Sequence, residues 1–197
     1  ANILCEKYEV EIACTYQLYK EPGFKIDDRV KITYLVKNYV PNKKELKESL
    51  KKKKLISAFK EGLKSVKILY LRRKTMIDYI KHSDADYIIS TRDIFDRWLG
   101  DYANSDTIKI GWEHNHHHNN KKYAINIIRS SWNLDYLVLV SKDLTKFYKN
   151  EMRKSKCTCV YIPNVLDSIP KKLAPLKEKR LISVGRLSKE KAPEDLV

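Results

Sequence analysis

The sequence lacks several features that would assign it to a common class of protein. No apolar run reaches the roughly 20 residues needed to cross a bilayer, and residues 1–5 show no basic segment followed by an apolar one. The four cysteines form neither a zinc-site spacing nor a disulfide framework. No internal repeat, RNP-like motif, helix-turn-helix or zinc-finger pattern occurs. These absences favour a cytoplasmic protein with no nucleic-acid partner.

The charge is large and unevenly placed. The formal net charge is +15 at pH 7, and residues 42–81 hold 14 Lys/Arg against 4 Asp/Glu, a net +10. Such a patch attracts nucleic acid, an anionic membrane surface or phosphorylated substrates. A solvated helical face rich in lysine explains the same composition. The sequence alone leaves both interpretations open.

Strand-like and helix-like segments alternate along the chain. The run 136–140, Tyr-Leu-Val-Leu-Val, is continuously apolar, which is typical of a strand covered by helices on both faces. Apolar residues recur at helical spacing from Leu46 to Val66, and further helices are expected at 123–132 and 144–154. The alternation predicts an α/β fold with a doubly wound, mostly parallel, Rossmann-like sheet. The expected strands are 8–15, 29–36, 86–90, 107–112, 135–141, 158–162 and 180–184.

A domain boundary is expected near residue 165. Pro163-Asn164 ends the strand at 158–162, and the stretch 166–179 contains two prolines and four lysines, which is typical of a linker. A fresh strand at 180–184 then opens a second α/β unit that extends to Val197. The predicted organisation is therefore a domain at 1–165, a linker at 166–179 and the start of another domain at 180–197.

The most informative motif lies in the last eighteen residues. Residues 181–191 read Leu-Ile-Ser-Val-Gly-Arg-Leu-Ser-Lys-Glu-Lys. A glycine lets the backbone of a strand-to-helix turn approach a ligand closely, while an arginine and a lysine suit a leaving diphosphate on which negative charge grows. The run resembles the opening of the donor domain in retaining glycosyltransferases of family 4, which have the GT-B fold. The resemblance assigns donor diphosphate binding to Gly185, Arg186 and Lys191.

Other segments extend this resemblance over most of the chain. The family carries a similar Pro-Asn at the end of its last N-domain strand and a strand that ends in serine before a helix, as at Ser141. The resemblance implies that 1–165 is the acceptor-side domain without its first strand, and that the fold is truncated at both ends. A missing central strand would leave unpaired edges on its neighbours, unless they pair directly or with a second chain. We expect this piece alone to be inactive.

A second motif, residues 111–118, follows an apolar strand and therefore lies where ligands bind in open α/β sheets. The family places a histidine near this position, facing the cleft between the domains. The resemblance implies that His114, with its neighbour Glu113, forms the catalytic part and hydrogen-bonds to sugar hydroxyls or to the developing charge. The acceptor side is assigned to Asn115, His116 and Arg92.

Two other interpretations apply to the four histidines in residues 114–118. They could bind a transition metal, but no acidic or cysteine partner stands at a recognisable ligand spacing, so no metal site is expected. They could also belong to a polar loop before a helix, with Asn119 or Asn120 as the N-cap. The loop interpretation is favoured for His117 and His118.

The resemblance implies a cytoplasmic enzyme, peripheral on the inner face of the membrane, that transfers a sugar with retention from a UDP- or GDP-linked donor to a glycan or lipid-linked acceptor. It implies no cofactor, because cationic side chains hold the diphosphate. The basic residues at 42–81 suit an anionic bilayer, although Leu46, Leu50 and Phe59 could equally face the core. The alternatives are a non-catalytic module that binds sugars or nucleotide sugars and, less favoured, a basic nucleic-acid-binding protein.

Overall fold

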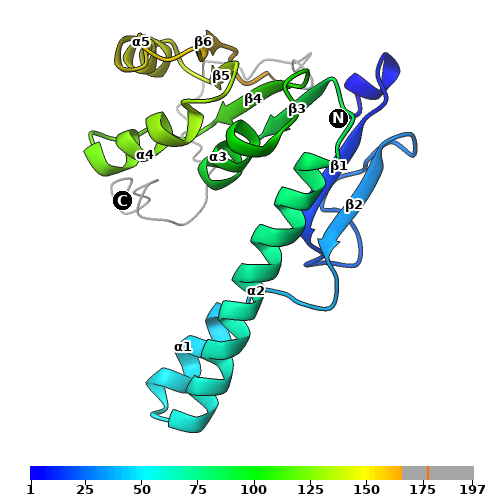
Figure 1. Ribbon diagram of the computed structural model, residues 1–197, viewed down its shortest axis with the longest axis vertical. Coiled ribbons are helices and arrows are strands. Elements are labelled where there is room, and N and C mark those ends of the chain that lie inside the picture. The colour runs from blue at the N-terminus through cyan, green and yellow to red at the C-terminus, as the bar shows by residue number, and fades with distance from the viewer. Residues whose placement is uncertain (166–176, 178–197) are drawn as a thin grey trace. The chain divides into compact units, whose positions relative to one another are not determined.

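The computed structural model of the chain describes residues 1–165 and Lys177. The chain divides into two compact units, Ala1–Pro163 and Asn164–Val197, and every helix and strand described below belongs to the first unit (Figure 1). The strand expected at 180–184, and all of the expected linker at 166–179 except Lys177, lie outside the described residues. Within the described part, the architecture is α/β with parallel sheets and five α-helices.

The larger sheet has four parallel strands in the order β3, β4, β5 and β6 (Figure 1). Leu137, Val138 and Leu139 of β5 are all buried, and this burial on both faces explains why the run does not alternate between apolar and polar residues. All four strands were predicted to within two residues at each end. Their bounds are β3 Tyr87–Ser90, β4 Ile108–Glu113, β5 Tyr136–Leu139 and β6 Thr158–Tyr161.

Three helices connect these strands: α3 (Asp93–Tyr102), α4 (Lys121–Ser131) and α5 (Lys142–Glu151). Helix α3 packs on β3, β4 and α4, while α5 packs on β5 and β6. The side chain of Asn120 accepts a hydrogen bond from the Tyr123 amide at 3.1 Å and so starts α4, and Ser141 caps α5 in the same way. The helices expected at 123–132 and 144–154 are confirmed.

A single apolar core joins the four-stranded sheet to its helices. Strand β5 and helices α3, α4 and α5 contribute apolar side chains with almost no exposed surface, so burial rather than surface charge holds the sheet to its helices. The fully buried apolar residues are Leu99, Ile127, Leu134, Leu137, Leu139, Leu144, Tyr148 and Met152.

The strands β1 (Glu11–Tyr16) and β2 (Lys31–Val36) form a separate parallel pair. Glu11 faces Lys31 across this pair, with an ion pair of 3.2 Å between Lys31 Nζ and Glu11 Oε2. Within residues 1–165 the pair is not hydrogen bonded to the four-stranded sheet. The sheet was predicted without its first strand, which leaves a gap between 29–36 and 86–90, and the described strands form two sheets on either side of that gap in the chain. Direct pairing across the predicted gap does not occur among them.

The basic segment forms two helices, α1 (Lys43–Lys51) and α2 (Leu55–Lys81), as its apolar spacing predicted. They are separate because Lys53 adopts a left-handed backbone conformation (φ 52°), which no α-helix can contain. Helix α2 contacts α1, β2 and α3. None of the described helices is both long enough and apolar enough to span a membrane.

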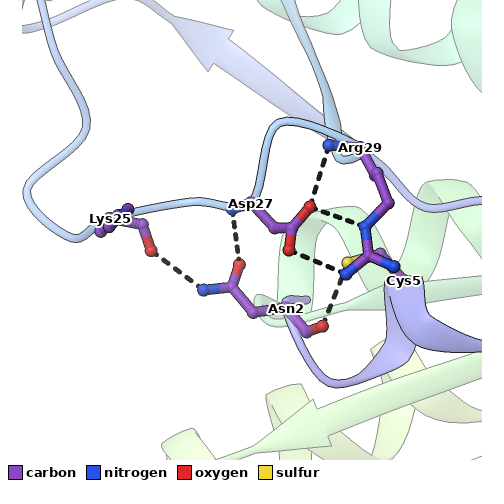
Figure 2. Close-up of polar contacts among 5 residues, drawn as sticks. All are labelled: Asn2, Cys5, Lys25, Asp27 and Arg29. Atoms are coloured by element: carbon purple, nitrogen blue, oxygen red, sulfur yellow. Dashed lines mark hydrogen bonds and ion pairs between the residues drawn. The ribbon is translucent and has the colours of Figure 1, made fainter.

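The chain before β1 is anchored by polar contacts (Figure 2). The Asn2 side chain donates to the Lys25 carbonyl and accepts from the Asp27 amide, both at 3.0 Å, and the Cys5 thiol donates to the Asn2 carbonyl. Two guanidinium nitrogens of Arg29 donate to the Asp27 carboxylate at 2.8 and 2.9 Å, which lowers the pKa of Asp27. The contacts fix a short 3-10 turn, Leu4–Glu6, ahead of β1.

Candidate functional site

The candidate site lies along the carboxyl edge of the four-stranded sheet. Because the strands are parallel, their carboxyl ends share one edge, and ligands of open α/β sheets bind there. Strand β3 ends at Ser90, whose partner in β4 is Gly111. Strand β4 continues two residues beyond Gly111 and ends at Glu113, whose partner in β5 is Leu139. The loops that follow β3 and β4 hold Arg92 and the residues 114–118. The topology therefore brings these predicted residues to the same edge.

Glu113 is the anchor of this edge. Its side chain is buried, and both carboxylate oxygens accept hydrogen bonds: Oε1 from the Asn115 amide at 2.6 Å and Oε2 from the Tyr123 hydroxyl at 2.9 Å. Burial, together with the hydrogen bond and charge of Glu113, raises the pKa of Tyr123 to about 12. The tyrosine therefore remains a hydrogen-bond donor at neutral pH. In this geometry Glu113 holds the loop and helix α4 in place, which is a positioning role.

His114 is exposed at the end of β4. Its ring lies parallel to the half-buried ring of Trp112, with centroids 5.9 Å apart and an interplanar angle of 7°. Residues two apart on a strand share a face, which is why these two rings can align. The stack orients the imidazole while leaving it open to a ligand. His114 is thus an accessible hydrogen-bonding group on a fixed support.

The next histidines are used within the loop. Nδ1 of His116 accepts from the His118 amide at 2.9 Å, and Nδ1 of His117 accepts from the Asn119 amide at 3.1 Å. His117 also packs on Phe147, with ring centroids 4.4 Å apart. Its pKa is lowered mainly by burial and, to a smaller extent, by the charges of the neighbouring His116 and His118. These contacts agree with the polar-loop interpretation of His117 and His118, and Asn120 is the N-cap. Among residues 1–165 and Lys177, no group of three His, Cys, Asp or Glu side chains could hold a metal ion.

Arg92 lies at the start of α3, just after β3, the strand that pairs with β4. Its backbone is extended, its carbonyl accepts from the Ser90 hydroxyl at 3.2 Å, and its side chain is exposed. In the part of the chain that is described, the guanidinium forms no ion pair. The neighbouring Asp93 accepts a hydrogen bond from Asn126 of α4. Arg92 therefore offers a cation to an anionic or hydroxyl-rich ligand.

Asp96 is a buried carboxyl group near this edge that sequence reasoning missed. It lies beneath Gly111 of β4, where an added Cβ would stand 3.2 Å from Asp96 Oδ1 and 2.8 Å from a Leu134 methyl carbon. Burial raises its pKa to about 7, the charges of Glu113 and Asp93 add to the shift, and the Ser90 hydroxyl opposes it. The only signal in the sequence was an acidic residue surrounded by apolar neighbours in Ile-Phe-Asp-Arg-Trp-Leu.

The predicted donor residues Gly185, Arg186 and Lys191 lie outside the described residues. The predicted residues that are described form a polar edge: an exposed imidazole at His114, an exposed guanidinium at Arg92, and a loop fixed by Glu113. Such an edge can hydrogen-bond to hydroxyl groups and can attract negative charge.

Comparison of the chain with family models, with curated proteins and with solved structures finds no match.

Proposed function

We propose that the chain is the acceptor-side part of a retaining glycosyltransferase of family 4, with the GT-B fold and a doubly wound N-terminal domain. The observation that carries the proposal is the polar loop at the carboxyl end of β4, in which a buried Glu113 fixes the backbone and His114 is left exposed on the Trp112 ring. A parallel α/β sheet with a hydrogen-bonding edge is the arrangement that such a transferase requires. The motif at 181–191 supports the same class.

The proposed roles follow from the chemistry of each side chain. His114 hydrogen-bonds to hydroxyls of the transferred sugar, or to charge that develops on it, and Glu113 positions the loop. Arg92, Asn115 and His116 face the acceptor. Gly185, Arg186 and Lys191 bind the diphosphate of a UDP- or GDP-linked sugar. Their cations offset the charge of the leaving group, so the reaction needs no metal.

The test is a screen of nucleotide sugars with the full-length protein, in which release of the nucleotide and transfer of the sugar are both measured. We expect Arg186→Ala and Lys191→Ala each to lower kcat by about 100- to 1000-fold, because each removes a cation that stabilises the leaving diphosphate. His114→Ala should lower kcat with little change in stability, since its side chain is exposed. Lys149→Ala, an exposed lysine in the last turn of α5 and so at the other end of that helix from the carboxyl edge, is the matched control and should retain activity. A protein that neither binds nor cleaves any nucleotide sugar would refute the proposal.

A non-catalytic module that binds sugars or nucleotide sugars is the second candidate. It is favoured by the engagement of both Glu113 oxygens, which leaves this carboxylate without a free role as acid or base. Calorimetric binding of a nucleotide sugar without turnover, abolished by His114→Ala, would select this candidate.

A further inference from the structure

Helix α2 carries a row of exposed apolar side chains that the proposed transfer reaction does not use. Successive residues of an α-helix are rotated by about 100°, so the row falls within a sector of about 100° on one side of the helix. Each side chain is between 57% and 81% exposed. Single exposed apolar residues are ordinary, whereas a contiguous row marks a surface for interaction. We call this row the α2 stripe; it comprises Leu55, Ile56, Phe59, Leu63, Val66 and Tyr70.

Polar contacts hold α1 against the other side of α2. Asn42, which is buried, donates to the Glu61 carbonyl at 2.9 Å and to its carboxylate at 2.6 Å, and it accepts from the Ser65 hydroxyl at 2.8 Å. The hydroxyls of Ser49 and Ser57 lie 3.1 Å apart. Ser57, Glu61 and Ser65, the members of these contacts that belong to α2, lie on the side of the helix opposite the stripe in the helical rotation. The packing of α1 on α2 therefore leaves the stripe exposed.

Exposed lysines border the α2 stripe on one side. Lys60, Lys64 and Lys67 lie about 20–80° beyond its edge in the helical rotation. A shallow hollow at the turn between α1 and α2 is lined by Lys53, Lys54, Leu55, Ile56, Ser57 and Lys60, so that cations and apolar groups are side by side. The acidic groups offset little of this charge, because residues 42–81 keep a net +10.

We propose that the α1–α2 hairpin docks on an anionic phospholipid bilayer, with the α2 stripe in the interfacial layer and the lysines at the lipid phosphates. A bilayer offers an apolar layer and negative charge at adjoining depths, which match the stripe and its lysine border. Nucleic acid offers the charge without a surface for six apolar side chains. A second copy of the chain would bring another net +10 against the first. The inference does not depend on the transferase activity.

The test is flotation of the full-length protein with vesicles of phosphatidylglycerol and phosphatidylcholine (1:1), and with pure phosphatidylcholine. Binding to the anionic vesicles alone, weakened by salt, is the expected result. Phe59→Ser combined with Leu63→Ser should lower binding by at least tenfold. The matched control is Phe24→Ser with Leu18→Ser, which changes residues outside the hairpin that are more exposed than Phe59 and Leu63, respectively, and it should bind as the parent does.

A charge-reversal pair tests the other half of the surface. Lys60→Glu with Lys64→Glu should weaken partitioning by at least about 25-fold, since each basic residue near the surface contributes about fivefold. Lys121→Glu with Lys122→Glu makes the same change of net charge at the start of α4 and should have little effect. Circular dichroism checks the fold of each variant, and Phe59→Trp should show a blue-shifted emission on anionic vesicles.

Three results would overturn the proposal: stripe variants that bind vesicles as the parent does, a parent that binds duplex DNA more tightly than anionic vesicles at equal salt, or a stripe that controls dimerisation instead of vesicle binding.

Discussion

At the scale of single residues, Asp96 is a carboxyl group whose burial disfavours its charged form. Its side chain is only 4% exposed, and Oδ1 has no hydrogen-bond partner in the part of the chain that is described. Gly111 allows this close approach, because any side chain there would collide with Leu134 and Asp96. A buried carboxyl group without a cation beside it resists ionisation, and this is why its pKa rises to about 7.

The pKa of Asp96 makes the stability of the protein depend on pH. Between pH 3.8 and about 7, the carboxyl group of Asp96 is still protonated in the folded state. In the unfolded state, where its pKa is 3.8, it has already lost the proton. The free energy of unfolding should therefore fall as pH rises from about 4 to 7, by at most about 4 kcal/mol, and this contribution should then level off. Asp96→Asn removes the titration, so we expect a higher Tm at pH 8 and a flatter profile in thermal melts. The exposed Asp28→Asn is the control; an Asp96→Asn profile as steep as the parent's would contradict the assignment.

The burial of Asp96 could not be predicted from the sequence, because it depends on partners distant in the chain. The pattern identified 107–112 as a strand, yet nothing local indicates that Gly111 lies over a carboxyl group of α3. The place of Glu113 and His114 at the carboxyl end of a strand could be predicted from the sequence, because they follow an apolar run directly. The hydrogen bond that fixes Glu113 could not be predicted, since its partner Tyr123 comes ten residues later.

Among the elements, β4 and α4 are joined by one hydrogen bond from the Tyr123 hydroxyl to Glu113. Tyr123→Phe would leave Glu113 Oε2 buried without its donor, and we expect a loss of about 1–3 kcal/mol in the free energy of unfolding. The measurement is urea denaturation of Tyr123→Phe, Glu113→Gln and the double variant, whose coupling energy isolates the pair. Tyr136→Phe, at a partly exposed ring on β5, should stay within about 0.5 kcal/mol of the parent. Additive single effects would show that the bond does not join the two elements.

The elements themselves were largely predictable, because local pattern dictates them. The strands of the larger sheet, the helical spacing in 42–81 and Asn120 as a cap all follow from local chemistry. What could not be predicted is which faces of α1 and α2 pack. Leu46 is half-buried while Leu50 and Phe59 are exposed, although all three share the same spacing. That choice is made by Asn42 and the serines that attach α1, and these contacts are not visible in an apolar pattern.

At the scale of the whole molecule, charge is concentrated in one hairpin. Residues 42–81 hold +10 of the formal +15, which leaves +5 for the other 157 residues. A field made by clustered charges is strongest beside the cluster, and salt screens it over about 10 Å at 0.1 M. A protein of this kind should therefore meet an anionic surface through the hairpin rather than in random orientations.

Two variants of equal net charge separate orientation from total charge. Lys60→Glu with Lys64→Glu, and Lys121→Glu with Lys122→Glu, each lower the formal net charge from +15 to +11. We expect the hairpin pair to elute from a cation-exchange resin at clearly lower salt than the α4 pair, because it removes the charges that make the first contact. Equal elution would mean that the resin responds to total charge, and that the hairpin gives the molecule no preferred orientation. A large difference would mean that the position of a lysine, and not only the number of lysines, decides which side of the protein faces a negative surface.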